Sequence, residues 1–214
     1  MTINTDNLLE SILASLDRVD YIKAEEIPDI DLYMDQMTSF MDERLKPSAR
    51  HEDTDKILTK TMINNYAKND LLPPPVKKKY SKEHILMLVF IYYFKGVLSI
   101  GDIQKLLQPL TERYFHNEQG GLTLEEVYET VFSMESGRAQ EVKEDVKTAY
   151  ERACSVFTDV EDEEEAEMLR NFAFICILSF DVYMKKLMIE KIIDGLPDQR
   201  QTKKRERKQG DTNG

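Results

Sequence analysis

Apolar residues recur every three or four positions through most of the chain, which is the spacing at which a helix buries one of its sides. This pattern predicts amphipathic helices over residues 3–22 and 32–45. Residues 46–55 are polar and have no period, so we expect a loop there. A short helix is predicted over 59–69, with Thr59 as its capping residue.

The middle of the chain contains a rigid break followed by a strongly apolar helix. Residues 71–80 read LLPPPVKKKY and cannot be helical, because successive prolines hold the backbone extended and lack amide donors. The helix expected over 82–96 is apolar almost all round and should lie in the core. A capping box at Ser99 then predicts a short helix that ends near Pro109.

The second half of the chain is predicted to be helical as well. Thr123 and Glu126 form a capping box after a Gly-Gly break, and a helical period continues through the segment AQEVKEDVKTAYERACSVF. A long final helix is expected over about 163–194. We find no internal repeat and no convincing strand, so the predicted fold class is all-α.

Charge is distributed very unevenly around the formal net charge of -11. Residues 54–82 contain seven lysines and two acids, whereas residues 118–170 contain sixteen acids and five basic residues. The tail is basic again, with six basic residues and one acid over 200–208. Overall acidity therefore argues against a general nucleic-acid coat but leaves room for a local basic surface.

Targeting and membrane signals are not evident in the sequence. The first residues lack a basic region, and the most apolar run, residues 172–180, is too short to span a bilayer. We therefore expect a cytoplasmic protein with no membrane partner.

Catalytic chemistry has little support in the sequence. His51, His84 and His116 lie far apart and outside metal-binding motifs. Glycine-rich phosphate loops and the GxSxG nucleophile motif are missing from the sequence. Acids in the run 159–167 suit the first turn of the final helix better than a calcium loop. We therefore predict a non-enzyme with no catalytic residue, cofactor or metal.

The basic segment around the prolines suggests a binding surface. Three lysines, Lys77, Lys78 and Lys79, follow a stiff proline run, so their charges project from a defined place. An ordinary solvated helix and loop explains the charges equally well. The helix before the prolines offers donors to phosphates and base edges at Thr59, Lys60, Thr61, Asn64, Asn65 and Lys68.

The segment TKTMINNYAKNDLLPPPVKKKYSKEHILMLVFIYYFKGVLSIGDIQKLL resembles the winged helix-turn-helix of the MerR family of transcription regulators. Thr59 stands at the helix cap, Ile63 at the buried position and Asn64 where the family usually has arginine. The wing looks short, without a hairpin between the prolines and Tyr80. The resemblance implies a recognition helix in the major groove and Lys77 to Lys79 on phosphates. It implies DNA-facing positions at Lys60, Thr61, Asn64 and Tyr66.

Residues 27–110 also look like a bacterial domain family of unknown function, number 1836, which brings no established activity. We divide the chain into an N-terminal helix (1–26), a MerR-like DNA-binding domain (27–110), a C-terminal helical domain (111–196) and a disordered basic tail (197–214). The expected function is a homodimeric transcriptional regulator that binds double-stranded DNA, with a small-molecule or protein effector at the C-terminal domain. The alternative is a helical protein–protein interaction module that keeps this fold without binding DNA.

Overall fold

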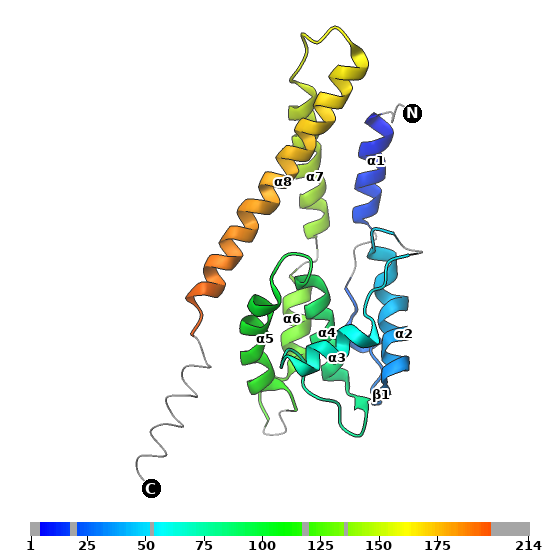
Figure 1. Ribbon diagram of the computed structural model, residues 1–214, viewed down its shortest axis with the longest axis vertical. Coiled ribbons are helices and arrows are strands. Elements are labelled where there is room, and N and C mark those ends of the chain that lie inside the picture. The colour runs from blue at the N-terminus through cyan, green and yellow to red at the C-terminus, as the bar shows by residue number, and fades with distance from the viewer. Residues whose placement is uncertain (1–4, 18–20, 52–53, 117–119, 135–136, 198–214) are drawn as a thin grey trace.

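The computed structural model is built mainly from helices, which confirms the all-α prediction. The helices lie in two groups, a lower body of short helices and an upper group that rises from it (Figure 1). None of the described helices is both long and apolar enough to cross a membrane. The structure describes residues 5–17, 21–51, 54–116, 120–134 and 137–197.

The lower body is arranged around one buried helix. This central helix, α4 (Lys82–Phe94), is buried at every position from His84 to Ile91, because two later helices, α5 (Ile100–Tyr114) and α6 (Leu124–Ser133), and a short strand contact it. Each large apolar side chain buried in this way contributes about 1.5–3 kcal/mol to folding. The helices of the lower body are α2 (Met34–Leu45), α3 (Lys60–Lys68), α4 (Lys82–Phe94), α5 (Ile100–Tyr114) and α6 (Leu124–Ser133), with 3-10 turns η1 (Ala24–Glu26) and η2 (Lys46–Ser48).

The predicted capping residues begin their helices. The hydroxyl of Thr59 accepts a hydrogen bond from the amide of Met62, at 3.2 Å, and so starts α3. Ser99 and Thr123 begin α5 and α6 in the same way. Each forms a capping box, in which the acidic side chain three residues later accepts a hydrogen bond from the amide of the capping residue. Such a cap is worth about 1 kcal/mol, since it satisfies an amide that has no partner inside the helix.

One helix runs further than the sequence predicts. α5 continues through Pro109 and ends at Tyr114, whereas we expected an end near Pro109. A proline inside a helix removes one backbone hydrogen bond. Leu110 and Tyr114, beyond the proline, pack against the main core, and this apolar contact offsets the missing bond.

Two short strands are also present, although the sequence predicts none. β1 (Leu32–Tyr33) pairs antiparallel with β2 (Lys79–Tyr80), with Leu32 opposite Tyr80 and Tyr33 opposite Lys79. Strands of two residues are too short to produce a readable alternation of apolar and polar positions. Their pairing joins the start of α2 to the segment that follows the prolines.

The upper group has its own small core. The long helix α8 (Glu163–Gly195) packs on α7 (Arg138–Cys154), and α1 (Thr5–Leu16) packs on α7 rather than on the main core. The main core extends past residue 110 to Phe132 of α6 and includes Ile193 near the end of α8. All of the predicted basic tail (197–214) except its first residue lies outside the described residues.

Candidate nucleic-acid interface

α3 separates its apolar residues from its polar ones. Ile63 is fully buried and anchors the inner side of the helix on the core. Positions three and four apart lie on one side of a helix, so the polar residues form one continuous outer face. This face is exposed and consists of Lys60, Thr61, Asn64, Asn65 and Lys68.

Tyr66 lies differently from the other predicted contact residues. Its side chain is only 7% exposed and belongs to the main core, and burial raises the pKa of its phenol. Its carbonyl accepts hydrogen bonds from the amides of Leu71 and Leu72, at 2.9 and 3.3 Å, which turn the chain at the end of α3. The structure therefore gives Tyr66 a packing role, and little of its surface remains for a ligand.

The segment after the prolines forms a tight hairpin that the sequence does not predict. Val76 and Lys79 exchange two backbone hydrogen bonds, of 3.1 and 2.9 Å. Lys77 and Lys78 between them have φ values of 50° and 65°. Positive φ at both central residues defines a type I′ turn, which is the favoured two-residue connection between antiparallel strands. We call residues 73–80 the wing, and its tip consists of two lysines.

Backbone strain is stored at this tip. The left-handed region costs a non-glycine residue roughly 1–2 kcal/mol, and asparagine or glycine are the usual residues in type I′ turns. Lysine offers no local compensation for this cost. Strained residues of this kind are concentrated at functional sites, where the position of a side chain matters more than stability.

The wing is held against the beginning of α2, which is in turn linked to the beginning of α3. The ammonium of Lys79 lies 5.3 Å from the centre of the Tyr33 ring, within the range of a cation–π contact. Tyr33 is the residue immediately before α2, and Asp35 in the first turn of α2 forms an ion pair with Lys60 at the start of α3. The three segments therefore form one connected surface at one end of the lower body.

A buried histidine fixes the base of the wing. The Nδ1 atom of His84 accepts a hydrogen bond of 3.0 Å from the amide of Ser81, so the ring of neutral His84 carries its proton on Nε2. Edge-on contacts join this ring to Tyr80 and Phe115. Burial lowers the pKa of His84 to about 4, an effect that the nearby carbonyl of Pro74 partly offsets. The ring is therefore neutral at pH 7.

The long loop before α3 leaves the polar face of the helix open. Ile57 and Leu58 are buried, and the carbonyl of Ile57 accepts a hydrogen bond of 2.8 Å from Lys95 at the end of α4. The hydroxyl of Ser48 lies 3.4 Å from the hydroxyl of Tyr92, which is on α4. The described part of the loop is thus tied to α4, and the outer residues of α3 keep their exposure.

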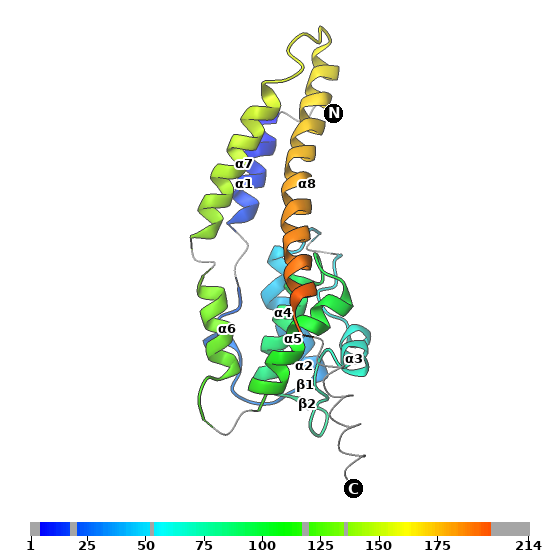
Figure 2. The ribbon, with the colours of Figure 1, turned by 90° about the vertical axis from the view of Figure 1, so that its left-hand side faces the viewer.

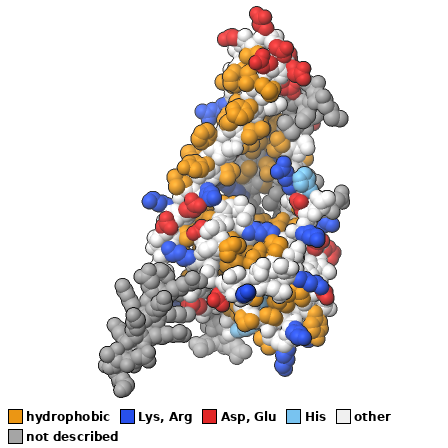
Figure 3. Space-filling model, in the orientation of Figure 1, with side chains coloured by type: hydrophobic (Ala, Val, Ile, Leu, Met, Phe, Trp, Pro, Cys, Tyr) orange, Lys and Arg blue, Asp and Glu red, His pale blue; other side chains and the backbone are white. Residues whose placement is uncertain are grey.

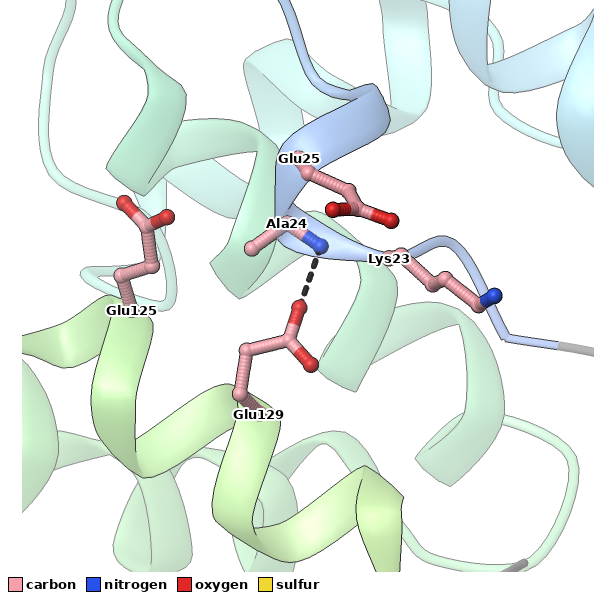
Figure 4. A pocket seen from close by; sticks show the side chains of 5 residues that line it. All are labelled: Lys23, Ala24, Glu25, Glu125 and Glu129. Atoms are coloured by element: carbon pink, nitrogen blue, oxygen red, sulfur yellow. Dashed lines mark hydrogen bonds between the residues drawn. The ribbon is translucent and has the colours of Figure 1, made fainter.

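The electrostatic character of the surface varies from side to side. Figure 3 shows basic side chains over α3 and over the wing below it. A pocket of about 330 Å³ beside α6 is acidic instead, with Glu25, Glu125 and Glu129 around it (Figure 4). One of these acids, Glu129, accepts a hydrogen bond of 2.5 Å from the amide of Ala24. Among the described residues, no three His, Cys, Asp or Glu side chains are placed to share a metal ion.

The fold and this surface define a helical protein with one basic face, built from a short exposed helix and a hairpin. The chain belongs to the family described as Domain of unknown function (DUF1836), whose model matches residues 22–131, or 110 of the 214 residues. The match covers the lower body from the start of the main core to α6. No curated protein and no solved structure matches the chain.

Proposed function

We propose that this protein binds double-stranded DNA and acts as a bacterial transcriptional regulator. The observation that carries the proposal is one exposed surface that combines the polar face of α3 with the lysine tip of the wing. A helix about 10–12 Å across fits the major groove, and amide and ammonium groups on it can reach base edges and phosphates. The resemblance of this segment to the MerR winged helix-turn-helix supports the same assignment.

Each part of the surface has a distinct role in this proposal. Asn64 and Asn65, on the exposed side of α3, are suited to paired hydrogen bonds with adenine, so they would contribute sequence preference. Lys60 and Lys68 near the two ends of α3 would contact phosphates, as would the wing lysines Lys77 to Lys79. Five such contacts predict a slope of about -4.5 in a plot of log affinity against log salt.

A second candidate is a protein–protein interaction module that uses the same face. The ion pair between Asp35 and Lys60 favours it, because a DNA-binding surface gains nothing from a carboxylate beside its recognition helix. An acidic partner would meet the same lysines, but it would not require the asparagines to lie in a groove.

The deciding experiment is fluorescence anisotropy on pooled genomic DNA fragments, titrated with salt. We expect wild type to bind with the linear salt dependence above, and the variant Lys77→Ala/Lys78→Ala/Lys79→Ala to lose about 2.7 from the slope. The control variant Arg138→Ala/Lys147→Ala/Arg152→Ala removes the same charge from α7, in the upper group away from α3 (Figure 1). Absence of wild-type binding at low salt would refute the proposal, as would equal effects of the two variants.

A further inference from the structure

The helix α8 has a large apolar surface that the rest of the described chain leaves open. α8 packs on α7 through Phe174, and Leu178 is the last residue of α8 in their shared core. Below this point the two helices diverge in both views (Figures 1 and 2). The large apolar side chains that remain exposed on α8 are Met168, Phe172, Ile175, Phe180, Val182, Tyr183, Met184, Leu187, Met188, Ile189 and Ile192.

This surface is too large for an isolated soluble helix. An aromatic side chain presents about 150–250 Å² when fully open, so these half-exposed residues together expose roughly 1,000 Å² of apolar area. The largest apolar patch on a typical monomer is about 300–600 Å². A stable interface buries about 800 Å² on each partner. Figure 3 shows orange side chains along the upper and middle part of α8.

One stripe of the surface has the spacing of a helix–helix contact. Met168, Phe172, Ile175, Tyr183 and Leu187 follow one another at intervals that keep them on one side of α8. The only charged residue of α8 between positions 171 and 184 is Asp181, which the helical period places on the opposite side. The stripe is therefore a seam suited to knobs-into-holes packing against another helix.

Charges along α8 indicate that the partner helix is a second copy of α8. The first turns contain Glu163, Glu164, Glu165 and Glu167, whereas residues 185–194 contain three lysines and two acids. A parallel second α8 would place the two acidic ends together, whereas an antiparallel one would bring each acidic end to the part of the partner helix that holds the three lysines. The charges of α8 therefore favour an antiparallel pair over a parallel one.

We propose that two copies of this chain associate through an antiparallel contact between their α8 helices. The stripe from Met168 to Leu187 forms the centre of the contact, and the charged ends fix its direction. Because the argument uses only α8, it does not depend on whether the protein binds DNA.

Light scattering coupled to size-exclusion chromatography tests the association. Wild type is expected to have twice the chain mass of 25.0 kDa. The variant Phe172→Glu/Leu187→Glu should have the mass of one chain, with an unchanged helical circular dichroism spectrum because both side chains are exposed. Leu122→Glu is the matched control, since Leu122 is 50% exposed and Leu187 is 51% exposed. A wild-type monomer, or a variant that stays dimeric, would overturn the proposal.

Disulfide trapping tests the direction of the helices. Both native cysteines, Cys154 and Cys176, are free and would be replaced by serine. In that background, a mixture of the Met168→Cys and Leu187→Cys chains should form cross-linked dimers under mild oxidation, and neither chain alone should do so. Cross-linking of each chain with itself, and none between the two kinds of chain in the mixture, would refute the antiparallel arrangement.

Discussion

Stability and DNA binding should respond in opposite directions to a change at the wing tip. We consider the double variant Lys77→Asn/Lys78→Gly, which places the preferred residues of a type I′ turn at φ values of 50° and 65°. The strain of two lysines in this region amounts to roughly 2–4 kcal/mol. Asparagine at position 77 relieves only part of the strain at that position. Glycine at position 78 relieves the strain there but lowers the unfolding free energy by about 0.5–1 kcal/mol, because glycine has greater freedom in the unfolded chain. The expected net gain in unfolding free energy is about 1 kcal/mol.

Thermal unfolding and DNA titration together measure this prediction. A gain of 1 kcal/mol should raise the Tm by about 2–4 °C in a domain of this size. The same variant loses two charges from the tip, so its salt slope for DNA binding should fall by about 1.8. The protein should thus become more stable and bind DNA more weakly.

The variant Lys77→Ala/Lys78→Ala separates strain from charge. Alanine removes the same two charges but keeps a Cβ atom in the left-handed region, so DNA binding should fall equally while the Tm does not rise. If both variants had the same Tm, the strain argument would fail. If the Asn-Gly variant kept the salt slope of wild type, the tip would not contact DNA.

Two further predictions concern single residues. The folded-state pKa of His84 is about 4, whereas its ordinary value is 6.5. The unfolded chain therefore takes up the proton first as the pH falls. About 2–3 kcal/mol of unfolding free energy should be lost between pH 6.5 and 4. Chemical denaturation at several pH values should show a smaller loss for His84→Gln, and an identical loss would contradict this assignment. Asp35→Asn should free Lys60 and raise DNA affinity roughly two- to fivefold at fixed salt. Asp17→Asn, which breaks an ion pair with Lys143 in the upper group, should leave the affinity unchanged in the same anisotropy titration.

Much of the helical framework could be predicted because its signals are local. The cap at Thr59 and the boxes at Ser99 and Thr123 each depend on residues three apart, and the structure places a helix start at every one. The apolar run of α4 likewise predicted a core helix, since a helix that is apolar all round has no side suited to water.

The features that sequence reasoning missed depend on contacts between distant residues. The wing hairpin pairs with Leu32 and Tyr33, far away in sequence, and its Lys-Lys tip contains none of the Asn-Gly signal that usually marks such turns. The continuation of α5 past Pro109 depends on contacts that Leu110 makes with the core. The exposed surface of α8 could not be predicted either, because an apolar helix at the end of a chain is expected to be buried.

The length of α8 has a consequence for how a dimer would sit on DNA. A helix of 33 residues is about 50 Å long, and in an antiparallel pair the two lower bodies lie at opposite ends of the shared seam. This length exceeds the 34–36 Å that separates half-sites one turn of B-DNA apart. Half-sites only one helical turn apart are therefore expected to be too close together for a dimer of this kind.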